Sequence, residues 1–360
     1  MAQGVPIRVY QVTVGTESAT FANSPGQHNS SEIDAVVFDN IKMEARVSVD
    51  NSPTTTSSDD VEFRFYNLNK TTRQALMREN ATLMLKAGYD TSWNRDSEGS
   101  IIAEHDTLPV IFIGGIVHAY TKKDPGSDDV LTIVNCSSDQ KIRNMTKVSV
   151  SYKPNTPKAD VIRDLVKRLG FPVSRMELQS LGSVAYPSGK AIYGQLDHAL
   201  TRICKECGLQ YSVHNGTISV IPANEKPVEG TDTSVDAWLY TPSQVMELDA
   251  YFEQKSVKLK PKKTGSSRGK KASAETPEDT DVSITDGIRT KTRQGINMRS
   301  HLNGNIKMHD FIKMDGLNAV VPDGADGDLK DGVYRVIRID HAINWPQGDW
   351  STALKLVEIQ

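Results

Sequence analysis

Apolar and polar residues alternate along the first 150 residues with the two-residue period of β-strands. Every second residue of Ile41–Asp50 is apolar, and Val61, Phe63 and Phe65 repeat the pattern with charged residues between them. Such a strand buries one face and exposes the other. The polar stretch 51–60 between the two runs is typical of a hairpin connection.

Four further apolar runs of this region are predicted to be strands, and one short segment is predicted to be a helix. The runs cover residues 7–14, 82–87, 110–120 and 130–135. The helix is expected over Lys70–Arg78, where the side chain of Asn69 can cap the first turn. Residues 89–107 have no apolar period and are expected to form a long loop, of a length that often carries function.

The middle of the chain changes from the period of strands to that of helices. Thr156 and Pro157 are typical of a helix start, and apolar residues at helical spacing follow them as far as Gly170. A second helix is expected over Gln195–Cys207. Asn215-Gly216 then separates two short alternating runs, which is a strong signal for a β-hairpin.

The last third of the chain is again predicted to be β. Five Asn-Gly or Asp-Gly pairs lie between residues 303 and 332, and they separate short apolar runs at 306–308, 311–314, 334–339 and 352–359. Dense turn signals between short strands favour a small antiparallel barrel or sandwich. The sequence therefore predicts a mainly β protein with an α/β insert, divided into residues 1–150, 151–225 and 226–360.

Composition narrows the class of protein further. The chain has 360 residues and a mass of 39.6 kDa, more than one hydrophobic core usually absorbs. Its mean hydropathy is -0.43, and no apolar run approaches the ~18 residues of a membrane-spanning helix. The N-terminal residues lack the pattern of a signal peptide, and three cysteines fit a reducing compartment. We expect a soluble protein that is not exported and makes no contact with membranes.

Positive charge is concentrated in one short segment. Residues 255–271 hold eight Lys or Arg and no acid, so removing them from the net charge of -3 leaves -11 for the rest. This segment opens a low-complexity stretch, 255–281, which is expected to be an exposed loop. It is interpreted as a solvated charge run, as a docking site for an acidic partner, or as a binder of nucleic-acid phosphates. The candidate docking residues are Lys258, Lys260, Lys262, Lys263, Arg268, Lys270 and Lys271.

The sequence offers no convincing catalytic or metal site. Residues 265–269 match the G-x-S-x-G pattern but lack the strand and helix that a nucleophile elbow requires. Cys204 and Cys207 have no second pair to complete a zinc site, so a core position is favoured over redox or metal chemistry. His105 and Asp106 lie in a polar loop without a nearby nucleophile. No catalytic, cofactor-binding or metal-binding residue is predicted, and no cofactor is expected.

Several degenerate motifs follow one another in an order that resembles a known family. In the first region the motifs are Val61–Leu68, Thr72–Leu76, Leu83–Tyr89 and Ile111–Val117; the segment 157–222 and residues 331–352 follow them. The first-region motifs resemble the first barrel of bacteriophage baseplate hub proteins, which include late-control protein D and the hub part of type VI secretion spikes. The segment 157–222 is similar to the middle insert of that family, and residues 331–352 are similar to its closing strands.

The resemblance implies a structural role in a phage tail. Hubs of this family form homotrimers in which each chain supplies two tube-like β-barrels, giving a pseudo-six-fold ring around the DNA channel. The implied partners are a tail tube protein or tube initiator, the central spike protein, and baseplate wedge or sheath-side proteins, with genomic DNA only as passing cargo. The implied location is the tail baseplate of a virion assembled in the bacterial cytoplasm. An acidic body would let DNA pass without adhering, because like charges repel.

Two other functions stay open at the level of the sequence. One is a cell-wall hydrolase of the tail tip, which would require a nucleophile or a pair of acids on a rigid element. The other is a nucleic-acid-binding module that uses residues 255–271.

Overall fold

The computed structural model describes eleven stretches of the chain: residues 7–16, 35–50, 60–78, 80–90, 107–124, 127–137, 147–222, 237–258, 284–285, 288–316 and 331–358. The fold is mainly β, as the sequence predicts, with large antiparallel sheets and little helix. No helix in these stretches is long and apolar enough to cross a membrane.

One sheet of fourteen strands dominates the molecule. Its main path is β16 (Val245–Lys258), β18 (Ile288–His301), β21 (Trp350–Glu358), β20 (Gly332–Trp345), β3 (Met43–Asp50), β4 (Asp60–Tyr66), β7 (Val130–Ser137), β6 (Val110–Lys123), β5 (Ala81–Asp90), β1 (Ile7–Thr16) and β2 (Val36–Phe38). Off this path lie β15 (Ala237–Tyr240), β17 (Ile284–Thr285) and β19 (Phe311–Met314). The short helices α2 (Lys70–Leu76) and η3 (Pro242–Gln244) belong to the connections.

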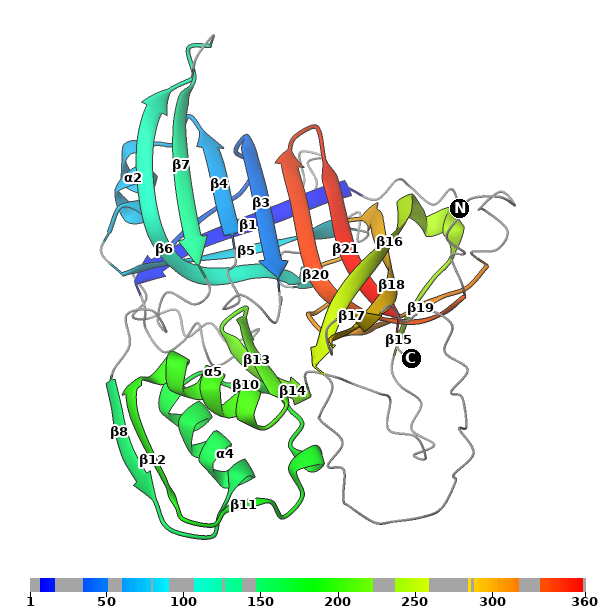
Figure 1. The fold of residues 1–360 in the computed structure, drawn as a ribbon. Helices are drawn as coiled ribbons and strands as arrows, with labels where there is room; N and C mark the ends of the chain where they lie inside the picture. The colour runs from blue at the N-terminus through cyan, green and yellow to red at the C-terminus, as the bar shows by residue number, and fades with distance from the viewer. Residues whose placement is uncertain are drawn as a thin grey trace, which may run out of the picture.

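The pairing of β20 with β3 joins the first and the last third of the chain. The two strands are antiparallel, with Arg338 opposite Asp50 and Trp345 opposite Met43. Figure 1 shows them side by side, one from each end of the sequence. Side chains from both thirds form a single apolar core on one face of the sheet. The two β regions therefore share one continuous sheet, a connection that the local sequence pattern does not reveal.

Of two local predictions for segments around this core, one is confirmed and one is wrong. The helix α2 begins where expected, and the Asn69 side chain accepts a hydrogen bond from the Thr72 N–H at 2.7 Å. The strand predicted at 306–308 is wrong, because these residues lie between β18 and β19 without strand pairing. Ile306 and Met308 are nevertheless buried in the core, so their apolar character serves packing rather than a strand.

The insert forms a separate lobe below the sheet in Figure 1. Its strands are β8 (Lys147–Tyr152), β9 (Thr156–Pro157), β10 (Val173–Met176), β11 (Ala185–Tyr186), β12 (Lys190–Gln195), β13 (Leu209–His214) and β14 (Thr217–Pro222). Its helices are α4 (Lys158–Leu169), η2 (Gln179–Leu181) and α5 (Leu196–Glu206). Residues between 148 and 220 build a core of their own around α4 and α5.

The turn chemistry of the insert follows the sequence with one correction. Gly170 ends α4 in the left-handed conformation, with φ of 74°, and Asn215-Gly216 forms the tip of the β13–β14 hairpin. Thr156 does not cap α4: the helix begins at Lys158, with Pro157 in the cap position and no side-chain cap bond. Thr156 instead pairs with Tyr186 in the two-stranded sheet of β9 and β11.

Candidate functional site

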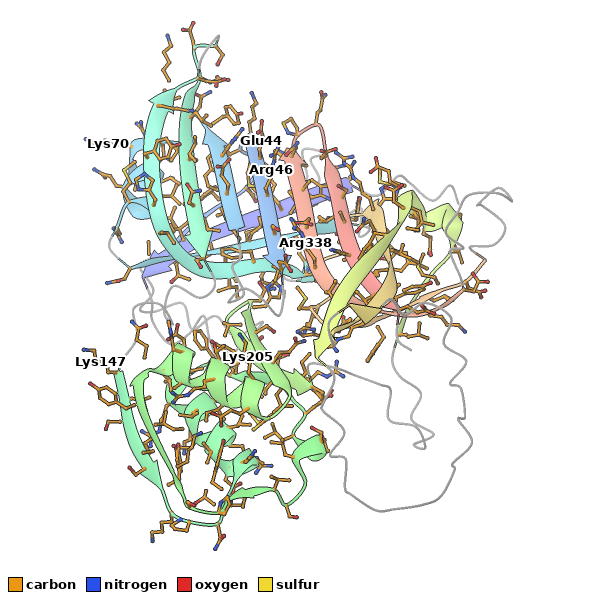
Figure 2. The ribbon with its side chains drawn as sticks, in the orientation of Figure 1. Glu44, Arg46, Lys70, Lys147, Lys205 and Arg338 are labelled. Carbon is orange, nitrogen blue, oxygen red and sulfur yellow. The ribbon has the colours of Figure 1, made fainter. Side chains whose placement is uncertain are left out.

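Charged side chains cover the outer face of three neighbouring strands, β20, β3 and β4. Because side chains alternate along a strand, the apolar residues of these strands enter the core and the polar ones face outward. We call this surface the ion-paired face. Figure 2 shows Glu44, Arg46 and Arg338 on it. Its charged members are Glu44, Arg46, Asp50, Glu62, Arg64, Arg338 and Asp340.

Arg338 links β20 to β3 at the seam between the two β regions. Its guanidinium donates to the Asp340 carboxylate at 2.7 Å and to the Ser48 hydroxyl at 3.2 Å. The Asp50 carboxylate lies 3.9 Å away on β3. The hydrogen bond to Asp340 and the nearby carboxylates raise the pKa of Arg338 above its ordinary value, so this cation stays charged and fixed at the seam.

A second pairing links β3 to β4. Arg64 lies 2.7 Å from the Glu62 carboxylate and 3.7 Å from that of Glu44. The hydrogen bond to Glu62 is the main cause that raises the pKa of Arg64. The Tyr66 hydroxyl donates to Glu44 at 2.9 Å, and burial, followed by Glu44, raises the pKa of Tyr66 to about 12. Each carboxylate of this group is thus engaged with a donor.

The ion-paired face carries almost no net charge. Three arginines stand against four carboxylates, so the face is not acidic, although the body of the chain is. Exposed ion pairs of this kind contribute little stability, roughly 0–1 kcal/mol each. Their effect is instead on the surface field: neighbouring opposite charges cancel over a few ångströms and leave little attraction for a polyanion. The arrangement offers a polar wall with almost no net charge.

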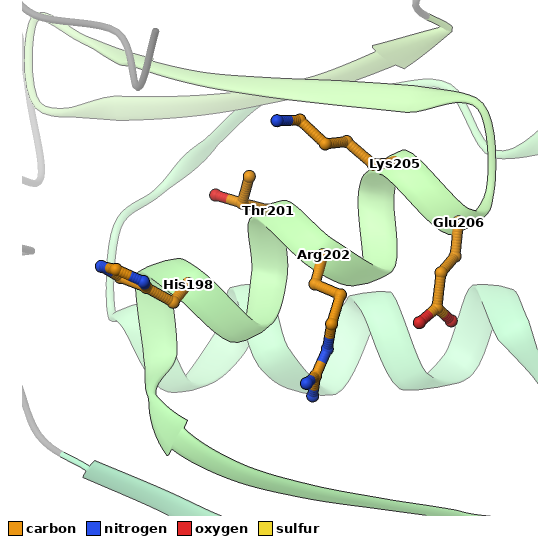
Figure 3. Close-up of a pocket in the computed structure, with 5 residues that line it drawn as sticks. All are labelled: His198, Thr201, Arg202, Lys205 and Glu206. Atoms are coloured by element: carbon orange, nitrogen blue, oxygen red, sulfur yellow. The ribbon is translucent and has the colours of Figure 1, made fainter. Parts of the chain in front are cut away.

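A shallow groove of about 570 Å³ runs along α5 in the insert. His198, Thr201, Arg202, Lys205 and Glu206 line it, and Figure 3 shows their side chains along the outer side of the helix. The Glu206 carboxylate is held by the Lys190 ammonium at 2.9 Å, and the Thr201 hydroxyl donates to the Asp197 carbonyl at 2.8 Å. Glu206 and the Thr201 hydroxyl are thus each engaged by a neighbouring group.

The two neighbouring cysteines fit the core interpretation. Cys204 is 1% exposed and belongs to the core of the insert, and Cys207 is half-buried one turn later. Burial raises the pKa of the Cys204 thiol to about 12 and also raises that of Cys207. Both thiols stay protonated near neutral pH, which makes them poor nucleophiles and poor metal ligands. Among the described residues, no group of three or more His, Cys, Asp or Glu could hold a metal ion.

Several candidates from the sequence lie outside the described residues. They include His105, Asp106 and the G-x-S-x-G match at 265–269. Lys258 is the last residue of β16, and only the backbone of this residue is described. The other candidate docking residues, Lys260, Lys262, Lys263, Arg268, Lys270 and Lys271, fall in the undescribed stretch 259–283.

The sequence pattern predicts which sides of β3 and β4 face solvent, but it does not reveal that these sides and β20 form one ion-paired face. The alternation of charged and apolar residues at 44–50 and 62–66 shows which side chains face outward. The partners on β20 are almost 300 residues away along the chain, so no local signal connects Arg338 with Asp50.

Comparison with known proteins gives a likeness of fold. No family model matches the sequence, and no curated protein matches it either. The 43 kDa tail protein of prophage MuSo2 from Shewanella oneidensis superposes with a TM-score of 0.51 over 97% of this chain and 98% of that chain, at 8% identity. The tail protein of Neisseria meningitidis MC58 gives 0.51 over 97% and 96%, at 11% identity. This chain has the fold of those tail proteins.

Proposed function

We propose that this protein is the hub of a phage-type tail baseplate and performs structural work rather than chemistry. The observation that carries the proposal is the shared fold. Two tail proteins superpose on 97% of this chain, and the superposition covers 98% and 96% of their own chains. A match of this extent covers both β regions and the insert. The motif order that resembles the baseplate hub family supports the same conclusion from the sequence.

In this role the protein is a homotrimer that joins a six-fold tail tube to a three-fold spike. Each chain supplies two β regions, so three chains provide six similar units. The sheet is suited to such assembly because, among the described strands, its path ends at β16 on one side and at β2 on the other. In the described part of the chain, β16 is a strand of 14 residues that pairs with β18 alone. An open edge of this length is covered in an assembly by a neighbouring chain.

The ion-paired face lines the DNA channel of the ring. A wall that binds DNA must release counterions from the phosphates by offering unpaired cations. Arg64 and Arg338 are instead engaged by carboxylates on their own or neighbouring strands. DNA therefore passes such a wall with little adhesion, and the neutral face serves this purpose in place of the acidic one expected from composition.

The three sequence regions act as separate parts of the hub. Residues 1–150 and 226–360 supply the ring, and residues 151–225 form an outer domain. The ring contacts a tail tube protein or tube initiator on one side and the central spike on the other, with wedge or sheath-side proteins around it. In this role the protein belongs to the tail baseplate of the virion and is assembled in the host cytoplasm.

The solution mass of the full chain, measured by light scattering, tests this proposal. The expected result is three times 39.6 kDa, either for the chain alone or after addition of a spike protein from the same genome. A tube protein is added in a second arm. A monomer that ignores both partners would overturn the proposal.

Two charge variants test the channel assignment. Arg338→Glu removes a paired cation and makes the face acidic, whereas Asp340→Asn frees Arg338 from its carboxylate. Binding of short duplex DNA to the trimer should rise in Asp340→Asn and stay near background in the native protein and Arg338→Glu. Lys153→Glu, on the exposed surface of the insert, is the control. Strong salt-sensitive binding by the native ring would contradict the channel assignment and favour nucleic-acid binding.

A further inference from the structure

Among the described residues, hydrogen bonds and a cation–π contact join the insert to the sheet; in the latter, the Arg175 guanidinium lies 5.7 Å from the Phe311 ring centroid. Asn215, at the tip of the β13–β14 hairpin, accepts a hydrogen bond from the Ile113 N–H at 3.2 Å and donates to the Val110 carbonyl at 3.3 Å. Arg175 on β10 donates to the His309 carbonyl at 3.4 Å. The apolar cores of the insert and the sheet are separate clusters. In the described part of the chain, the insert is therefore attached to the sheet by polar and cation–π contacts rather than by a shared apolar core.

His309 occupies the centre of this junction. It is 1% exposed and takes the left-handed conformation, with φ of 72°, shortly before β19. Its Nδ1 lies 3.1 Å from the Arg335 guanidinium on β20, and its Nε2 lies 3.4 Å from the Ser212 hydroxyl on β13. A single imidazole thus connects the sheet with the insert.

The Arg335 contact fixes the protonation state of this imidazole. A guanidinium has only N–H donors, so His309 Nδ1 must act as the acceptor. The ring is therefore neutral, and its one proton sits on Nε2, where it faces Ser212. A proton added to Nδ1 would replace this hydrogen bond with two cationic donors 3.1 Å apart.

Other charged groups surround His309 from each neighbouring element. Lys307 and Asp310 belong to its own segment, and the Asp310 carboxylate accepts the Lys307 N–H at 2.8 Å. Arg175 on β10 forms an ion pair with Glu177. His214 ends β13. Burial is the main cause that lowers the pKa of His309 well below its ordinary value, and Arg335, Arg175 and His214 lower it further.

His214 makes the same side of the junction sensitive to acid. Its Nδ1 is buried, with no hydrogen-bond partner among the described residues. Burial, followed by the charge of Lys307, lowers the pKa of His214 to about 4. A second proton would therefore enter the same contact region at low pH.

We propose that the junction is an acid-sensitive joint, in which protonation of His309 breaks the chain Arg335–His309–Ser212 and releases the insert from the sheet. The two lobes stay folded because each keeps its own core. The released state exposes the hairpin tip and the β10 surface. Near neutral pH the joint is closed, and acidification opens it.

Distance measurement by pulsed electron paramagnetic resonance tests the joint in the full chain. Spin labels are placed at Lys205→Cys on α5 and Arg46→Cys on β3, both exposed positions. The half-buried Cys207 is replaced by serine in this background. A narrow distance distribution is expected at pH 7.5 and a longer, broader one near pH 5. Tryptophan fluorescence and far-UV circular dichroism should show that both lobes remain folded.

His309→Gln is the decisive variant. Its amide keeps an acceptor for Arg335 and a donor for Ser212 but cannot take up a proton. It should retain the narrow distribution at pH 5. His198→Gln, at an exposed histidine on α5, is the matched control and should open like the native protein. Three outcomes would overturn the proposal: an unchanged distribution in the native chain, opening of His309→Gln at the same pH, or unfolding of both lobes before the joint opens.

Discussion

His341 lies inside the sheet, where burial opposes a charged imidazole. Its side chain is 4% exposed, and Nδ1 lies 2.9 Å from the Thr352 hydroxyl. The same hydroxyl oxygen accepts the Asn303 N–H at 2.9 Å. Burial is the main cause that lowers the pKa of His341 to about 3, and His214 lowers it further, against Asp340. The folded protein thus holds this ring neutral over the whole physiological range.

The sign of the resulting pH dependence follows from this shift. The pKa in the unfolded chain is about 6.5, so the unfolded state takes up the proton first. The contribution of His341 to the free energy of unfolding is therefore complete above about pH 6.5 and is lost as the pH falls toward 3. The loss is about 1.4 kcal/mol per pH unit, which amounts to about 2 kcal/mol at pH 5. Between pH 7 and pH 5, the free energy of unfolding of His341→Gln, measured in urea, should therefore fall by about 2 kcal/mol less than that of the native protein. His118→Gln, at an exposed position, should decline like the native protein. Equal declines in all three proteins would contradict the assignment.

At the scale of the element, β16 and β18 can pair closely because residue 295 is glycine. Tyr251 on β16 lies opposite Gly295. A Cβ at 295 would lie 2.3 Å from the Tyr251 ring and 2.5 Å from the Leu356 carbonyl oxygen. The Tyr251 hydroxyl donates to that same carbonyl at 3.0 Å, and the Lys355 ammonium lies 4.5 Å from the ring centroid. The tyrosine therefore fills the space that a side chain at 295 would need.

Gly295→Ala is expected to destabilise the protein by about 1–3 kcal/mol, because the backbone carbonyl of Leu356 cannot move aside as a flexible side chain would. Urea unfolding followed by tryptophan fluorescence measures the loss. Asn297→Ala lies two residues further along β18 at an exposed position and should change stability by no more than about 0.5 kcal/mol. A Gly295→Ala protein as stable as this control would show that the strands separate at little cost.

Elements whose signals are local could be predicted from the sequence. Asn69 caps α2, Gly170 ends α4 and Asn215-Gly216 turns the hairpin, because each acts on backbone groups a few residues away. The prediction of a strand at 306–308 is wrong because an apolar run alone does not distinguish a strand from a buried loop segment.

At the scale of the whole molecule, the decisive contacts join residues that are far apart in the chain. Arg338 meets Ser48 across 290 positions, and His309 meets Ser212 across 97. Nothing in a local pattern encodes such register, since it depends on which strands pair in space. For this reason the local pattern reveals neither the ion-paired face nor the junction.

The sheet and the insert each have a hydrophobic core of their own, so we expect them to unfold as two separate units. Leu200 is fully buried in the core of the insert, and Leu354 is 2% exposed in that of the sheet. Replacing either leucine with alanine leaves a cavity that typically costs about 2–5 kcal/mol. Because the two apolar cores are separate clusters among the described residues, each loss should stay within its own lobe. Such behaviour is typical of domains with independent cores.

Two spectroscopic probes separate these units, because residues 147–222 contain no tryptophan and hold α4 and α5, the two long helices. Tryptophan fluorescence follows the sheet, and helical circular dichroism follows the insert. In urea, Leu200→Ala should lower the midpoint of the helical signal and leave the fluorescence midpoint in place. Leu354→Ala should do the reverse. If both probes moved together in both variants, the lobes would unfold as one unit, and the division at residues 151–225 would have no thermodynamic meaning.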